Sequence, residues 1–157
     1  MNKLNRKLEY SLIALKHMSQ KIPGELTTAK EVADAYHTPF DASARVMQQL
    51  AQKGFLKSEQ GAFGGYQIIQ DLGKLTLYDL MEVVSGPISV VKCTNKEDCD
   101  IQSTCNIVSP IHILNQKMSA FYKGISLKEL LLETSAPSNG RTNKKKPLAE
   151  GEQHGSL

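Results

Sequence analysis

The three cysteines of this chain, Cys93, Cys99 and Cys105, form one evenly spaced C-x5-C-x5-C run. They lie in a charged stretch between two segments with helical patterning, although free cysteine usually behaves as a small buried apolar residue. Thiolates that converge from one loop are typical of a soft-metal site, which holds either zinc or an iron–sulfur cluster. The run therefore predicts a metal-binding loop that the helices on either side must support.

The spacing of the run bears on which metal is bound. Structural zinc sites usually contain C-x2-4-C pairs, and this run has no such pair and no histidine inside it. A disulfide would leave one cysteine over, and no signal peptide opens the chain, so we expect reduced thiols in the cytoplasm. The spacing favours an iron–sulfur cluster over zinc or unligated redox-reactive thiols, and a cluster needs a fourth ligand from elsewhere.

Composition limits the class of protein without identifying it. Apolar residues make up 40% of the 157, enough for a core, and no apolar run approaches the ~18 residues of a membrane span. We therefore expect no membrane partner. The formal net charge of +3 is too small to indicate nucleic-acid binding by itself, so any basic patch must be local.

Helical periodicity dominates the first third of the chain. We expect helices over residues 6–20, 29–36 and about 40–53, separated by Pro23-Gly24 and by the turn His37-Thr38-Pro39. Thr28 is a suitable N-cap for the second helix, with Glu31 completing a capping box. Thr38 or Asp41 is expected to start the third helix. The order of these helices predicts a helix-turn-helix.

A hairpin follows the third helix directly. Residues 55–58 and 66–69 have strand character, and a glycine-rich loop joins them. A hairpin in this place is a wing, so the fold class is mostly α with a small β-wing, a winged helix-turn-helix domain plus a dimerisation helix. The alternative is a three-helix bundle with an incidental hairpin, but the order of elements favours DNA binding.

The remaining helices suggest how the chain associates. Thr76 caps a helix that ends near residue 85, and a helix from Pro110 to about 122 carries an apolar stripe of Ile111, Leu114, Met118 and Phe121. Little of the chain remains to cover that stripe, so we expect a homodimer, whose twofold axis suits a pseudo-palindromic operator. Ser126 caps a last helix over 127–133. We divide the chain into a winged-helix DNA-binding domain (1–85), a cysteine cluster loop (86–109), dimerisation helices (110–133) and a disordered tail (134–157).

Four features coincide in this order: Glu9-Tyr10-Ser11-Leu12-Ile13-Ala14-Leu15, Thr28-Ala29-Lys30-Glu31-Val32-Ala33, Gly61-x-x-Gly64-Gly65-Tyr66, and the cysteine run. Together they resemble, over about residues 2–133, the bacterial winged-helix iron–sulfur regulators of the IscR, NsrR and RirA type. The resemblance implies a repressor that binds double-stranded DNA and senses nitric oxide, iron or redox state, and it does not imply an enzyme. A cluster-free regulator that uses the cysteines as zinc ligands or redox-active thiols is the alternative.

The resemblance also implies metal ligands. The family's three cysteines correspond to Cys93, Cys99 and Cys105. IscR-type members take their fourth ligand from a histidine at the place of Val108, whereas NsrR-type members use an aspartate of the partner subunit at the place of Glu9. Glu9 is therefore our candidate fourth ligand and His112 is the less favoured one. The lack of the IscR-type histidine favours a 4Fe–4S over a 2Fe–2S cluster.

The resemblance places DNA recognition on residues 40–53 and on the wing tip. Arg45 and Gln48 carry donors suited to guanine and adenine edges in the major groove, and Lys57 is suited to a phosphate. The full set of candidate DNA-binding residues is Thr28, Thr38, Phe40, Asp41, Ser43, Arg45, Gln48, Lys57, Gln60, Gly64 and Gly65.

Overall fold

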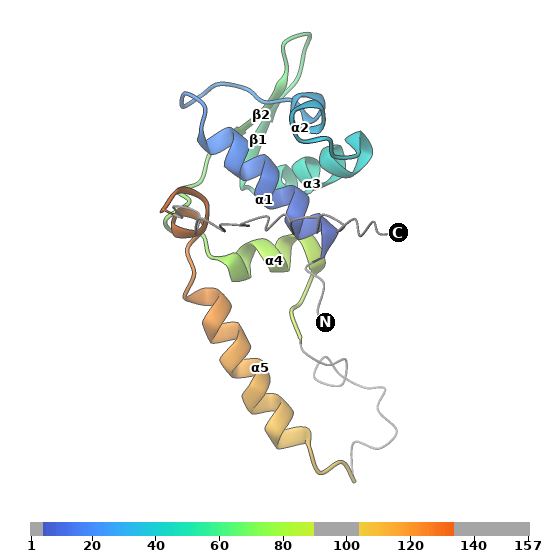
Figure 1. Cartoon of the computed structure of the whole chain (residues 1–157), viewed down its shortest axis with the longest axis vertical. Helices are drawn as coiled ribbons and strands as arrows, with labels where there is room; N and C mark the ends of the chain where they lie inside the picture. Colours follow the sequence, from blue (N-terminus) through green and yellow to red (C-terminus); the bar gives the residue numbers. More distant parts are fainter. Residues whose placement is uncertain (1–4, 90–103, 134–157) are drawn as a thin grey trace, which may run out of the picture.

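The structure, a computed structural model, describes residues 5–89 and 104–133. Its elements in chain order are α1 (Arg6–Ser19), α2 (Ala29–Tyr36), α3 (Phe40–Gln52), β1 (Leu56–Glu59), β2 (Gly65–Ile68), α4 (Leu77–Ser85), α5 (Val108–Lys123) and η2 (Glu129–Glu133). Within the described residues the chain is mostly helical with one two-stranded sheet, which confirms the predicted fold class (Figure 1). The described helices include none that is long and apolar enough to span a membrane.

Side-chain caps define the starts of α1 and α2. Asn5 caps α1 by accepting a hydrogen bond from the Lys7 N–H, and Thr28 caps α2 by accepting one from the Glu31 N–H. The predicted bounds of α2 are confirmed. The predicted capping box is only half formed, because the Glu31 carboxylate turns toward α1, where its Oε1 lies 2.8 Å from His17 Nε2.

The turn between α2 and α3 has helix-turn-helix geometry. His37 ends α2 in the left-handed conformation (φ 53°), which redirects the chain at once. Pro39, rather than Thr38 or Asp41, is the N-cap of α3, so the predicted start was wrong by one or two residues. The Thr38 and Ser43 hydroxyl oxygens lie 2.7 Å apart, and this bond joins the turn to α3.

The wing is a hairpin attached to the helical body. β1 and β2 pair antiparallel, with Leu56 opposite Ile68, and each begins within one residue of its predicted place. Thr27 pairs with the same hairpin: its N–H donates to the Tyr66 carbonyl at 2.9 Å and its carbonyl accepts from the Tyr66 N–H at 2.8 Å. The residue before the cap of α2 therefore fastens the wing to the helix-turn-helix.

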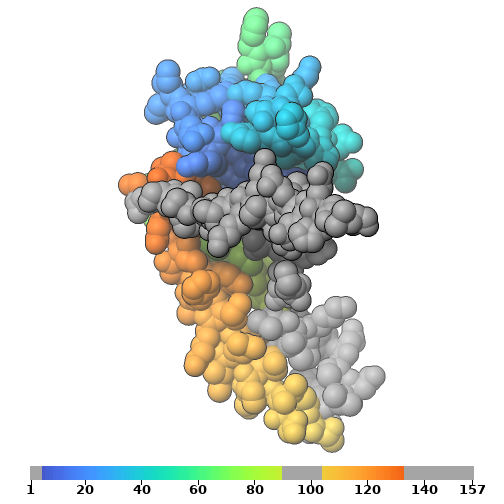
Figure 2. Space-filling view, viewed as in Figure 1, coloured from blue at the N-terminus to red at the C-terminus, as the bar shows by residue number. Residues whose placement is uncertain are grey.

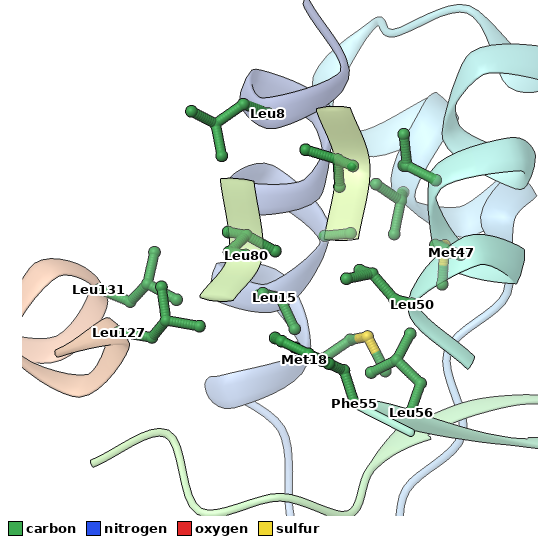
Figure 3. Close-up of a cluster of buried hydrophobic side chains, with 14 of the residues drawn as sticks. Leu8, Leu15, Met18, Met47, Leu50, Phe55, Leu56, Leu80, Leu127 and Leu131 are labelled. Atoms are coloured by element: carbon green, nitrogen blue, oxygen red, sulfur yellow. The ribbon is translucent and has the colours of Figure 1, made fainter. Parts of the chain in front are cut away.

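The core lies between α1, α3, α4, β1 and the end of the described chain. Figure 3 shows the side chains of Leu15, Met47, Leu50, Leu80 and Leu127 converging from these elements, and each is fully buried. Burying one such side chain contributes about 1.5–3 kcal/mol. This core holds α3 with one face inward, so its opposite face is presented to solvent.

The chain returns to the core after α5. Thr76, which caps α4 as predicted, forms an isolated bridge with Ser126, and the Leu127 N–H donates to the Leu75 carbonyl at 2.8 Å. The last helix, predicted over 127–133, contains the π-helical turn Glu129–Glu133. This segment therefore packs with the winged helix, although it follows the long helix α5 in sequence.

Helix α5 projects away from this body (Figures 1 and 2). None of its residues is buried, and Leu114 and Phe121 are 41% and 63% exposed. Ile107, just before the helix, is 53% exposed and lies seven residues before Leu114. Ile111 and Met118 of the predicted stripe are half-buried. The described part of the chain therefore leaves one apolar edge of α5 open.

Candidate functional site

One face of α3 forms a polar ridge that points into solvent. Its buried face consists of Ser43, Val46, Met47 and Leu50. The ridge lies on the opposite side at helical spacing and consists of four exposed residues, Asp41, Arg45, Gln48 and Gln52. The ridge therefore includes Arg45 and Gln48, the two residues predicted to read base edges.

A cleft of about 650 Å³ separates this ridge from the wing. Gln48 and Gln52 line it from α3, and Lys57, Gln60 and Tyr66 line it from the hairpin. An exposed helix beside a hairpin, with donors on both sides of the hollow, is a shape that can straddle a nucleic-acid backbone. The tertiary structure thus brings together Gln48, Lys57 and Gln60, which are separate in sequence.

The candidate DNA-binding residues in and around the turn between α2 and α3 differ in their exposure to solvent. Thr28 is exposed at the start of α2, and Phe40, at the start of α3, is 54% exposed. Thr38 is half-buried, and Ser43 is only 1% exposed, with its hydroxyl bonded to that of Thr38. We therefore correct the prediction for Ser43, because a buried hydroxyl that already has a partner is not available to DNA.

The wing tip carries one residue that the sequence argument missed. Phe63 is 93% exposed between the strands, although a large apolar side chain is usually covered. Gln60, also at the tip, is exposed. Lys57 Nζ lies 3.2 Å from Glu59 Oε1, so this lysine is held beside a carboxylate on its own strand.

Gly64 and Gly65 are required by the hairpin itself. A Cβ on Gly64 would lie 2.4 Å from the Glu59 carbonyl oxygen, and one on Gly65 would lie 2.9 Å from the Thr27 carbonyl oxygen. Both distances are too short for a side chain without movement of the backbone. Close packing inside the wing therefore accounts for both glycines without any contact to DNA.

An acid–base cluster fixes α2 against α1, and sequence reasoning missed it. Glu31 Oε1 lies 2.6 Å from Lys21 Nζ and 2.8 Å from His17 Nε2, and Tyr36 Oη lies 3.0 Å from His17 Nδ1. Burial opposes ionisation of Glu31, but hydrogen bonds and positive charge from Lys21 and His17 outweigh it and lower the pKa of the carboxyl. Burial likewise opposes the charge of Lys21, yet Glu31 and Glu25 raise the pKa of its ammonium group.

The predicted metal ligands are only partly within the described residues. Cys93 and Cys99 lie outside them. Cys105 is a free, half-buried thiol just before α5, His112 is exposed on α5, and Glu9 is half-buried on α1 with its Oε2 3.9 Å from Arg6 Nε. In residues 5–89 and 104–133 no three acidic, histidine or cysteine side chains gather into a metal site.

The placement of α5 separates two of these candidates. Figure 1 shows the amino-terminal end of α5 at the extremity of the projecting helix, whereas α1 lies in the body. A helix of 16 residues is about 24 Å long. Cys105, three residues before the start of α5, therefore belongs to the far end of the projecting helix, whereas Glu9 belongs to α1 in the body. The donor set of thiols and one carboxylate fits an iron–sulfur group chemically.

Sequence comparison finds relatives over most of the chain. The sequence pattern of the Rrf2 family, described as iron-dependent transcriptional regulators, matches residues 4–133. The HTH-type transcriptional regulator NsrR of Bacillus subtilis is 26% identical over 121 residues, which cover 76% of this chain and 81% of that protein. NsrR of Bacillus licheniformis is 25% identical over 121 residues, or 76% of this chain and 82% of the relative.

Solved structures share the fold. The global cysteine regulator CymR of B. subtilis superposes with a TM-score of 0.65 at 25% identity, covering 85% of this chain and 99% of CymR. IscR of T. potens superposes with a TM-score of 0.61 at 18% identity, covering 84% of this chain and 88% of IscR. The second likeness, at this identity, concerns the fold alone.

Proposed function

This chain belongs to the Rrf2 family of winged-helix transcriptional regulators, and from that premise we propose that it is a cytoplasmic, homodimeric repressor with an iron–sulfur sensor. The observation that carries the DNA-binding part is the exposed polar ridge of α3 beside the wing cleft. Helix-turn-helix proteins place such a helix in the major groove.

In this proposal, the DNA contacts fall into two kinds, those to base edges and those to phosphates. Arg45 and Gln48 read base edges, because guanidinium and amide groups make paired hydrogen bonds with guanine and adenine. Lys57 and Thr28 contact phosphates, and Gln60 approaches the minor groove from the wing tip. Thr38, Phe40 and Asp41 border this surface, while Gly64 and Gly65 shape the tip.

We propose that α5 forms the dimer interface. Ile107, Leu114 and Phe121 recur every seven residues along one exposed edge, the spacing with which two helices pack against each other. A twofold axis through this contact would present two α3 ridges to a pseudo-palindromic operator. The described ranges contain no other element that covers this edge.

We propose that Cys93, Cys99 and Cys105 of one chain and Glu9 of the partner hold the sensor, a 4Fe–4S in preference to a 2Fe–2S cluster. When bound, such a group supplies sensitivity to oxidants, nitric oxide or iron supply. Because a carboxylate is a harder ligand than thiolate, the Glu9 position would be the one most easily displaced. Its loss would release a tie between subunits and change the separation of the two α3 ridges. His112 is the less favoured fourth ligand, on its exposed face of α5.

Two measurements test this function. Anaerobic purification followed by an ultraviolet–visible spectrum, with iron and acid-labile sulfide assays, tests the sensor, and their ratio per chain distinguishes the cluster types. Selection of duplexes from a random pool tests DNA recognition and is expected to recover a pseudo-palindrome. A colourless protein that cannot be reconstituted, yet selects DNA, would support the alternative regulator with zinc-bound or redox-active cysteines.

A further inference from the structure

A second hollow lies on the other flank of α3. It is a cleft of about 540 Å³ between the start of α1 and the flank of α3 that faces away from the wing. Arg6, Lys7 and Tyr10 line it from α1, and Arg45 and Gln49 line it from α3. Arg45 therefore borders this second cleft, whereas Gln48, three residues later, borders the wing cleft.

The second cleft is positively charged. Three cations line it, Arg6, Lys7 and Arg45, against the single carboxylate of Asp41. Arg6 Nε lies 3.9 Å from Glu9 Oε2, too far for a strong bond. Within the described residues neither Lys7 nor Arg45 has an ion-pair partner. Unpaired cations around a hollow attract an anion.

The geometry of the major groove indicates which anion. The α3 ridge stands between two hollows, with the wing beyond one and the first turns of α1 beyond the other. A helix that enters the major groove, which is about 12 Å wide, has a sugar–phosphate strand on each side of it. If the wing cleft receives one strand, the second cleft, between α1 and α3, faces the other.

We propose that the cleft between α1 and α3 holds phosphates of the DNA strand opposite the wing, with Arg6 and Lys7 as its phosphate-binding residues. This inference rests on the proposed DNA-binding function and adds α1 to the interface. Phosphate contacts fix register and orientation without reading sequence. The two cations would therefore set the depth and tilt at which Arg45 meets the bases.

The test uses a labelled mixed-sequence duplex of about 30 base pairs, roughly three helical turns, so no operator is needed. Binding is measured by fluorescence anisotropy between about 50 and 200 mM KCl, and the slope of log K against log salt is compared. Each of Arg6→Gln and Lys7→Gln is expected to make the slope shallower by about 1, and the double variant by about 2. Arg6→Lys and Lys7→Arg keep the charge and should keep the slope.

Lys74→Gln is the matched control, because Lys74 is an exposed lysine in the turn between the wing and α4, outside both clefts. Slopes of the α1 variants equal to that of Lys74→Gln would overturn the inference while leaving the proposed function intact. Failure of the unaltered protein to bind any duplex would overturn both. The iron content of each variant is measured as well. If DNA binding falls only in preparations that contain no cluster, the effect belongs to the neighbouring Glu9, and the phosphate-binding role of Arg6 and Lys7 is overturned.

Discussion

Thr27 and Tyr66 exchange both of their backbone hydrogen bonds, at 2.9 and 2.8 Å, although they are 39 positions apart in the chain. The pair joins the wing to the residue immediately before the cap of α2. The position of the wing relative to the α3 ridge therefore depends on backbone contacts around Thr27, which is fully buried.

Gly65→Ala should loosen this junction. The new Cβ would lie 2.9 Å from the Thr27 carbonyl oxygen, and relieving the clash should reduce the free energy of unfolding by about 1–3 kcal/mol. Urea unfolding measures this change, and DNA affinity should fall in parallel. Gly73→Ala is the control, because its nearest contact is the movable Asp71 carboxylate at 3.2 Å. Equal stability of the two variants would contradict the tight junction.

Glu31→Gln should reduce stability at neutral pH and make it less sensitive to acid. The lowered pKa of Glu31 means that its contribution is present above the usual value of 4.5 and is lost as pH falls through the folded-state pKa. Because the side chain is 37% exposed, we expect a loss of about 1 kcal/mol or less at pH 7. Urea midpoints of protein and variant should converge once the pH falls below the folded-state pKa of Glu31. Asp34→Asn is the control, because Asp34 is an exposed acid on α2. Its urea midpoint should already equal that of the unaltered protein at pH 7 and should stay equal as the pH falls.

If α5 forms the dimer interface as proposed, Leu114→Glu should dissociate the dimer. It introduces a charge at the centre of the apolar edge of α5, and light scattering after size exclusion should show the mass halved. Ile113→Glu is a close control, because Ile113 is 53% exposed but lies on a different side of the helix from Ile107, Leu114 and Phe121. Equal masses for the two variants would contradict the assigned interface.

Mixing two defective chains tests the origin of the fourth ligand. Cys105→Ser and Glu9→Ala should each bind little iron as homodimers. In a heterodimer, one site would combine Cys105 of the Glu9→Ala chain with Glu9 of the Cys105→Ser chain, so one intact site should return. Iron per dimer and the visible spectrum report this recovery. Ligation within one chain predicts no recovery, and full clusters in Glu9→Ala alone would exclude Glu9.

Arg45→Ala should weaken binding to a selected duplex by about 1–3 kcal/mol and relax preference at one base pair of each half-site. Lys57→Ala serves for comparison, since loss of a phosphate contact should lower affinity for all sequences alike. Anisotropy titrations against single-base variants of the duplex separate the two outcomes. An equal loss on every sequence for both variants would remove Arg45 from base reading.

Much of the local structure could be predicted because its causes lie within a few residues. The bounds of α2, the Thr76 cap and the order of helices and hairpin follow from capping residues and apolar spacing. The local sequence does not show which side chains are buried. Ser43 lies among polar residues in the first turns of α3 and was predicted to contact DNA, but its hydroxyl faces inward toward Thr38.

The sequence by itself determined the family, the winged-helix order and the run Cys93, Cys99 and Cys105, because motifs and residue spacing are properties of the sequence and need no tertiary structure. Only the tertiary structure decided that α3 stands between two clefts, that Glu31 bonds His17 and Lys21 instead of its own cap, and that Leu127 returns to the core. These features arise from packing between segments far apart in the chain, where burial and hydrogen-bond geometry, rather than local propensity, select the contacts.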